Sequence, residues 1–144
     1  MLTSDGPNPD VFVLRIDAGG TVIRAERYGS AEPEYAEGLA ISSSGDAFLD
    51  GSLAGAIEIG GEPLDNVDGV DVLAARLSGA DFSNVWSRAY GGPQEQHAHA
   101  VGIDPQGFVL MAGCLYGTPS TIDFGDGVLQ GAGEFDAWMV KLAP

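Results

Sequence analysis

Three stretches of the chain share one pattern of apolar and polar positions, and each begins with an aspartate. They read DVFVLRID from Asp10, DVLAARLS from Asp71 and DAWMVKLA from Asp136. In each stretch one set of alternate positions is apolar, and the other set is mostly apolar before an Arg or Lys near its end. Strands with two apolar sides are typical of a sheet that is covered on both faces. The pattern therefore predicts three equivalent strands within a layered arrangement of sheets.

Further strand-like segments repeat in the same order between these stretches. TVIRAERYG (21–29) matches FSNVWSRAYG (82–91), and YAEGLAIS (35–42) matches HAHAVGID (97–104). A tight turn and another strand-like run follow in each copy, and then a less regular, glycine-rich excursion leads to the next aspartate. Glycines recur at one constant spacing, in the pairs Gly45 and Gly107, Gly51 and Gly113, and Gly55 and Gly117. We therefore expect a repeating unit of four short strands and one excursion, with Tyr28 and Tyr90 as packing residues at strand ends.

Four-stranded antiparallel units repeated at this spacing are typical of β-propeller blades. Leucine-rich and helical solenoids have shorter periods, and a β-sandwich has no reason to repeat its side-chain pattern at a fixed interval. The predicted fold class is all-β, with consecutive four-stranded antiparallel blades of a partial (open) β-propeller.

The order of these residues resembles the SBBP-type β-propeller repeat, which occurs in large secreted or surface proteins of bacteria. The resemblance extends from Asp10 to Pro144, and TIDFGDGVLQGAGEFDAWMVKLAP (121–144) carries it most clearly. Trp86 matches the tryptophan usual on the fourth strand of that repeat, whereas Arg24 takes its place in the first copy. The resemblance implies a blade fold and an extracellular or cell-surface location, and it implies no particular chemistry.

If each YAEGLAIS-like segment begins a new blade, the chain is predicted to have four parts. Residues 1–9 form a disordered N-terminal segment, 10–34 two strands of a preceding blade with its exit loop, 35–96 a complete blade, and 97–144 three strands of the following blade. Propellers typically close with about 4 to 8 blades. We therefore expect a fragment of a larger exported bacterial protein, or else self-association through exposed apolar blade faces.

Charge and composition narrow the function classes. The 144 residues include 6 basic and 21 acidic ones, for a formal charge of −15, so a surface that binds nucleic acid is excluded. No apolar run is long enough to insert into a membrane, and no signal peptide is visible in this chain. The single cysteine, Cys114, cannot form an internal disulfide, and its apolar surroundings predict a small buried residue.

Two groups of residues are candidates for metal binding. His97 and His99 are two positions apart on a predicted strand, so both imidazoles could reach one transition-metal ion. The acidic loops around 64–71 and 122–127 resemble calcium loops in composition, because calcium prefers oxygen ligands and glycine lets carbonyls turn inward. Their candidate ligands are Asp65, Asp68, Asp71, Asp123 and Asp126. Neither group matches a complete ligand motif, so we expect polar rim residues in the first case and turn-capping residues in the second.

The sequence offers no catalytic motif. The aspartates at positions 10, 71 and 136 open every copy of the same strand, so we expect them to accept hydrogen bonds from the preceding loop and not to act in catalysis. The predicted function is a non-catalytic scaffold or binding module for an unidentified protein or glycan, with no cofactor. Two alternatives remain open: a calcium-dependent adhesion or structural module, and the remnant of a propeller-based enzyme acting on glycans.

Overall fold

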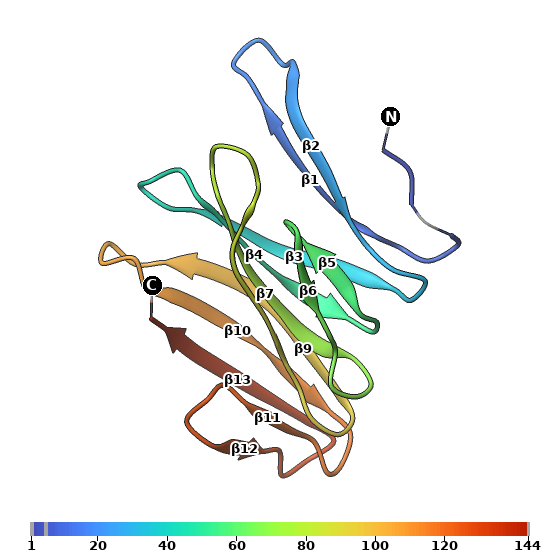
Figure 1. The fold of residues 1–144 in the computed structure, drawn as a ribbon. Coiled ribbons are helices and arrows are strands. Elements are labelled where there is room, and N and C mark those ends of the chain that lie inside the picture. The colour runs from blue at the N-terminus through green and yellow to red at the C-terminus, as the bar shows by residue number, and fades with distance from the viewer. Residues whose placement is uncertain (1, 5, 144) are drawn as a thin grey trace.

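The computed structural model describes residues 2–4 and 6–143, and every regular element in that part of the chain is a β-strand (Figure 1). This confirms the predicted all-β class. The described residues include no helix that could cross a membrane. In chain order the strands are β1 (Val11–Ile16), β2 (Val22–Tyr28), β3 (Glu34–Ile41), β4 (Ala47–Leu53), β5 (Ile57–Ile59), β6 (Glu62–Leu64), β7 (Asp71–Leu77), β8 (Asn84–Tyr90), β9 (Glu95–Ile103), β10 (Val109–Tyr116), β11 (Thr121–Asp123), β12 (Val128–Gln130) and β13 (Phe135–Leu142).

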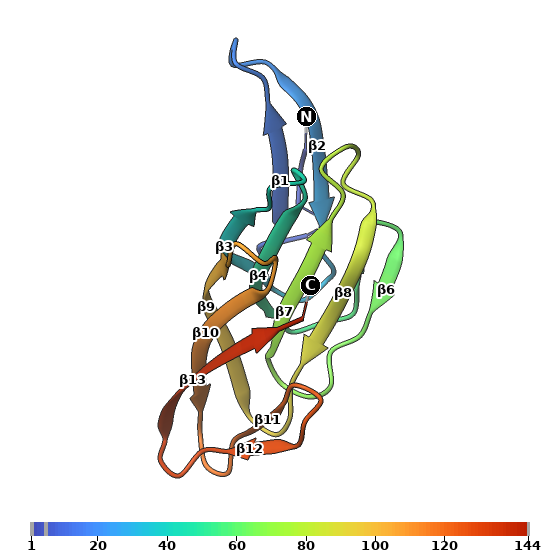
Figure 2. The ribbon, with the colours of Figure 1, turned by 90° about the vertical axis from the view of Figure 1, so that its left-hand side faces the viewer.

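Three antiparallel sheets are stacked as layers along the molecule (Figures 1 and 2). The first sheet pairs β1 with β2, the middle sheet has the order β3-β4-β7-β8, and the third sheet has the order β13-β10-β9. Each of these sheets is open and does not close on itself. Strands that follow one another across short turns become neighbours, which is the expected behaviour of an antiparallel meander.

The two glycine-rich excursions are more regular than predicted. The pair β5-β6 and the pair β11-β12 each form a small hairpin, inserted in chain order between the second and third strands of the larger sheets. Gly60 and Gly61 have φ angles of 56° and 93°, which the tight turn of the first hairpin requires. Strands this short cannot show a period, so the sequence pattern did not reveal these hairpins.

The connection from one sheet to the next uses the same contacts twice. The amide of Glu34 donates to the carbonyl of Pro9 (2.9 Å), and the amide of Gln96 donates to the carbonyl of Val70 (2.7 Å). The side chains of Glu34 and Gln96 are buried, and each accepts the amide of the residue four positions earlier, at 2.9 and 3.0 Å. Burial raises the pKa of the Glu34 carboxyl.

The aspartates at the start of equivalent strands bind nearby backbone and side-chain groups. Asp71 accepts the amide of the residue four positions earlier, and Asp136 accepts the amide three positions earlier at 2.9 Å, as predicted. Asp10 accepts the guanidinium of Arg27 at 2.9 Å. Asp71 is completely buried, and this burial raises the pKa of its carboxyl.

Two apolar cores fill the spaces between the layers. The core between the first and middle sheets includes Val11, Val13, Tyr28, Leu49, Leu53, Leu73, Ala75 and Leu77. The core between the middle and third sheets includes Phe48, Val72, Ala74, Tyr90, Met111, Leu115 and Trp138. Tyr28 and Tyr90 are both buried at strand ends, as predicted. Strand β4 is buried along its whole length, and β7 is buried except for the half-buried Arg76.

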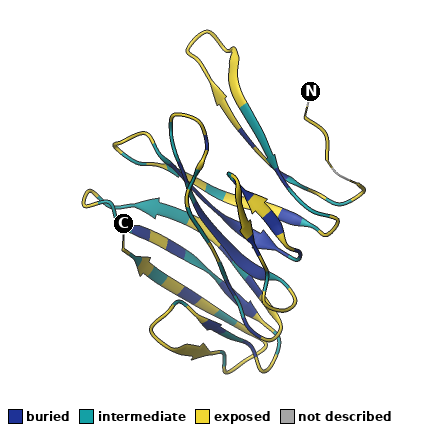
Figure 3. Ribbon diagram, viewed as in Figure 1, coloured by how far each residue is buried: buried dark blue, intermediate teal, exposed yellow. Residues whose placement is uncertain are grey.

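The strands β1 and β13 differ from β7 because only one of their faces is well covered. Phe12, Leu14 and Ile16 on β1 are exposed, and Met139 on β13 is 77% exposed. Figure 3 shows exposed positions along the first hairpin and along β13. The prediction of two covered faces is therefore right for β7 and wrong for these two strands. The physical reason is that the described residues place no further sheet beyond the first or the third.

The predicted parts of the chain correspond closely to the three larger sheets. The segment 10–34 contains the first sheet, 35–96 contains most of the middle sheet, and 97–144 contains most of the third. Strand β3 already begins at Glu34 and β9 at Glu95. Of the segment 1–9, residues 1 and 5 lie outside the described residues, as does residue 144. The Asn8 side chain donates to the carbonyl of Ala31 at 2.6 Å.

Candidate functional site

The first strand of the middle sheet and the first strand of the third sheet contain a β-bulge at the same place. In β3 the register shifts between Ala36 and Gly38, which leaves Glu37 as the extra residue. In β9 the register shifts between Ala98 and Ala100, which leaves His99 as the extra residue. A bulge turns the side chain of its extra residue away from the regular alternation. Two ionisable side chains, separated by the spacing of the repeat, are therefore presented at corresponding points of neighbouring sheets.

Glycine is required opposite each bulge. A Cβ atom added to Gly51 would overlap the carbonyl oxygen of Tyr35, and one added to Gly113 would overlap the carbonyl oxygen of His97. This pair of glycines, which the repeat places in equivalent positions, thus marks the points where a bulged strand approaches its neighbour most closely.

Asp50, on β4, is a buried acid beside the first bulge. Its residue is 0% exposed, and neither carboxylate oxygen has a hydrogen-bond partner in good geometry. Burial and, to a smaller extent, the negative charge of Glu37 raise the pKa of Asp50, whereas the Gly38 amide and His99 lower it; the net result is a pKa of about 6. A buried, unpaired acid of this kind destabilises the folded state when it ionises. Because no solvent reaches Asp50, it is not placed to act on an external substrate.

The two candidate histidines, His97 and His99, lie side by side on β9. Their rings are nearly parallel, with centroids 6.2 Å apart. His97 contacts Ser52 through Nδ1 at 3.2 Å and Glu95 through Nε2 at 3.4 Å. Within residues 2–4 and 6–143, no group of three or more His, Cys, Asp or Glu side chains could hold a metal ion. His97 and His99 each contact individual neighbouring side chains, and they are not part of a cluster of metal ligands among the described residues.

Cys114 is buried beside His99, as its apolar surroundings predicted. The sulfur lies 3.1 Å from Nε2 of His99, and the residue is 2% exposed. Burial raises the pKa of the Cys114 thiol, and a hydrogen bond with Tyr116 partly opposes this rise. A raised thiol pKa and low exposure both reduce reactivity, because the thiolate is the nucleophile.

Cys114 is therefore expected to resist thiol reagents in the folded protein. An aromatic disulfide reagent at pH 8 should label it at least ~100-fold more slowly than it labels the unfolded chain, because reaction requires local opening. The absorbance of the released thiolate measures the rate. The matched control is Ser44→Cys in a Cys114→Ser background, since Ser44 is in an exposed turn. Equal rates for the native and introduced thiols would contradict the buried assignment.

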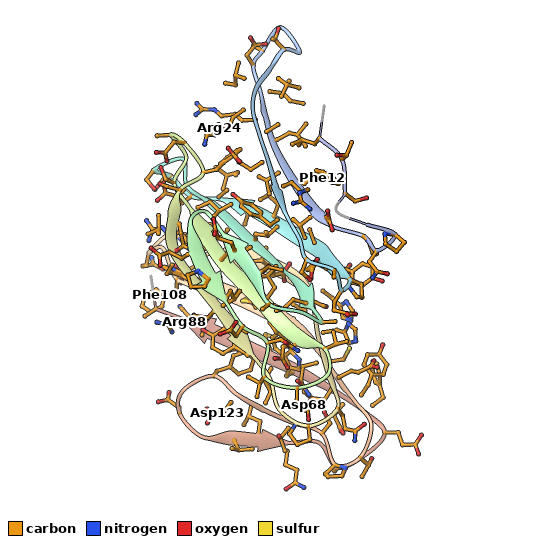
Figure 4. The ribbon with its side chains drawn as sticks, turned by 45° about the vertical axis from the view of Figure 1, so that its right-hand side comes forward. Phe12, Arg24, Asp68, Arg88, Phe108 and Asp123 are labelled. Carbon is orange, nitrogen blue, oxygen red and sulfur yellow. The ribbon has the colours of Figure 1, made fainter. Side chains whose placement is uncertain are left out.

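The candidate calcium ligands are distributed over two separate loops. Asp65 and Asp68 belong to the connection between β6 and β7, and Asp71 is the first residue of β7. Asp123 and Asp126 belong to the β11-β12 hairpin; Figure 4 labels Asp68 and Asp123. Asp123 accepts the amides of Gly125 and Gly127 at 2.7 and 3.2 Å, which is a turn-capping role. The buried carboxylate of Asp71 is bound to its own loop. Neither loop thus presents its aspartates as a convergent set.

The sequence reasoning missed Asp50, Glu34 and Gln96. Asp50 could have been noticed, because it interrupts the apolar run AFLDGSL, whereas Ala112 occupies the corresponding position of the second copy. Glu34 and Gln96 are likewise separated by the spacing of the repeat. Their burial could not be inferred, because both are polar side chains at the start of a strand, where exposure is the usual outcome.

An apolar hollow of about 750 Å³ separates the first sheet from the turn-bearing end of the middle sheet. Ile16, Leu39 and Ile41 line it and are all exposed. Val101 and Ile103 are the counterparts of Leu39 and Ile41 on β9, and they pack against the second core. The difference arises because β3 has no strand of the first sheet beside it at this end, so the hollow is an incompletely covered layer and not a shaped ligand cavity.

Comparison of the chain with family models and with curated proteins found no match to either. The resemblance to the SBBP-type repeat therefore stays a prediction.

Proposed function

We propose that this chain is a non-catalytic scaffold of consecutive β-propeller-type blades that form a partial, open propeller. The observation that carries the proposal is that the same sheet-on-sheet packing occurs twice. Val11 and Val13 of β1 pack towards the middle sheet, and their counterparts on β7, Val72 and Ala74, pack towards the third sheet. A repeated layer with repeated connections is the expected construction of a blade array.

The scaffold would act by holding its turns in fixed positions. Several turns are closed by an aspartate that accepts amides within its own turn. Asp17 binds the amides of Gly19 and Thr21, and Asp104 binds those of Gln106 and Phe108, all at 2.8–2.9 Å. Turns of this kind can vary in sequence while the sheets remain unchanged. A protein or glycan ligand would then be recognised by turn residues, and the resemblance to repeats of secreted proteins supports an extracellular or cell-surface setting.

The alternatives have less support in the contacts of the described residues. A glycan-processing enzyme needs two carboxyl groups that face one accessible cavity. The acid with the strongly raised pKa, Asp50, is completely buried. A calcium-dependent module needs about six oxygen ligands around one point, and Asp123 is engaged by its own hairpin turn.

The scaffold proposal predicts that a turn accepts an insertion that a strand does not accept. An eight-residue Gly/Ser segment placed between Pro105 and Gln106 should lower the free energy of unfolding by about 1–2 kcal/mol, through loop entropy and the lost contacts of Asp104. The same segment placed after Ala74 in β7 should abolish cooperative folding, because β7 is buried on both faces. Urea unfolding followed by tryptophan fluorescence measures both effects.

Comparing the two insertions tests whether the turns can change without unfolding the sheets. If the Pro105 insertion unfolds the chain as completely as the Ala74 insertion, the turns are not separable from the sheets, and the scaffold proposal is wrong. A third protein with the segment after Met1 controls for the added residues themselves.

A further inference from the structure

The first and third sheets each present an outer face with apolar side chains. We define the N-terminal face by Phe12 and Leu14 on β1, which are both exposed; Figure 4 labels Phe12 on the first hairpin. We define the C-terminal face by Leu110 on β10 and Met139 on β13, which are 37% and 77% exposed. Exposed apolar groups on neighbouring positions of a sheet favour association.

Each outer face has a counterpart inside the molecule that shows how it packs. Leu14 corresponds to Ala75, which lies in the core shared with the first sheet. Leu110 corresponds to Phe48, which lies in the core shared with the third sheet. The N-terminal face is thus equivalent to the face of the middle sheet that packs on the first sheet. The C-terminal face is equivalent to the face of the middle sheet that packs on the third sheet.

We propose that the C-terminal face of one copy packs on the N-terminal face of a second copy, so that the blade stack continues from molecule to molecule. This inference rests on the proposed scaffold function and adds its partner. The arrangement is head-to-tail, because both internal interfaces join unlike faces of successive sheets. An interface between two unlike faces does not saturate at a dimer, and it leads to longer assemblies or rings.

The packing inside the molecule favours a second copy as the occupant. In both internal interfaces, a face equivalent to the C-terminal face packs on a face equivalent to the N-terminal face. A second copy offers this same pair of faces. In addition, the C-terminal face has a shallow hollow of about 240 Å³, lined by Gly102, Leu110 and Met139 among others, where apolar side chains of the opposing face can pack.

Two single substitutions and their mixture test the head-to-tail geometry. Leu14→Asp places a charge on the N-terminal face, and Met139→Asp places one on the C-terminal face. Sedimentation velocity should show concentration-dependent species larger than a dimer for the unmodified chain, and at least tenfold weaker self-association for each variant alone. An equimolar mixture of the variants should form a one-to-one complex, because each variant retains the face that the other has lost.

The control is Val85→Asp, which adds the same charge at an exposed apolar position of β8 in the middle sheet. It should associate like the unmodified chain.

Self-association of Met139→Asp alone would show N-terminal faces pairing with each other, and self-association of Leu14→Asp alone would show C-terminal faces pairing with each other. Either result overturns the proposal, as does an unmodified chain that stays monomeric at about 100 µM. If the chain stays monomeric but still folds with the insertion after Pro105, the self-association proposal is wrong and the scaffold proposal is not affected.

Discussion

Replacing Asp50 with asparagine is expected to stabilise the protein at neutral pH, by up to about 3 kcal/mol. The carboxyl group is completely buried without a partner in good hydrogen-bond geometry, and its pKa is raised to about 6 from the ordinary 3.8. An ionised Asp50 therefore costs free energy in the folded state that it does not cost in the unfolded chain. Asparagine keeps the size of the side chain and removes the charge, and a buried neutral amide costs less than a buried anion.

The pH dependence of this effect has a definite sign. Between about pH 4 and pH 6 the folded protein binds a proton at Asp50 that the unfolded chain has released, so this group lowers stability progressively as the pH rises. The difference between Asp50→Asn and the unmodified protein should accordingly be small at pH 4 and largest above pH 6. Urea unfolding at several pH values measures it.

Asp126→Asn is the matched control, because it removes one negative charge from an exposed position of the same acidic chain. Its effect on the free energy of unfolding should remain within about 0.5 kcal/mol at each pH. Equal stabilisation by the two substitutions would assign the effect to net charge and contradict a specific penalty at Asp50.

Replacing Gly51 with alanine is expected to lower the free energy of unfolding by about 2–3 kcal/mol. The added methyl group would overlap the carbonyl oxygen of Tyr35 in the neighbouring bulged strand β3. Strand β4, which carries Gly51, is hydrogen bonded on both sides and has little room to move away. Because β4 lies at the centre of the stacked layers, the strain would reach both cores. Thermal unfolding followed by circular dichroism gives the loss of stability.

Gly102→Ala is the control for the change in glycine content. Gly102 also lies in a strand, β9, but an added Cβ would meet no atom within 4 Å, and its backbone is not in the left-handed region. Alanine there should be neutral or stabilising by up to about 1 kcal/mol, because it reduces the entropy of the unfolded chain. A loss at position 51 no larger than the change at position 102 would show that the close approach is not rigid.

The sequence predicts strands well where the repeat is long and apolar. The strands that follow Asp10, Asp71 and Asp136 are found at the expected positions, and Cys114 is buried as its surroundings indicated. The pattern failed for the short hairpins β5-β6 and β11-β12, because strands of this length carry no measurable period. The burial of Asp50 was not predicted either, because an acid within an apolar run is equally compatible with an exposed edge.

The sequence by itself determined the all-β class and the positions of the longer strands, because alternation of apolar residues and glycine-containing turns are local properties. It also determined that glycines recur at one constant spacing in two parts of the chain. Only the tertiary structure decided which faces are covered and where the bulges place Glu37 and His99. It also showed that Gly51 must lack a side chain. These features depend on which backbone lies against which, and such contacts join residues that are distant in the chain.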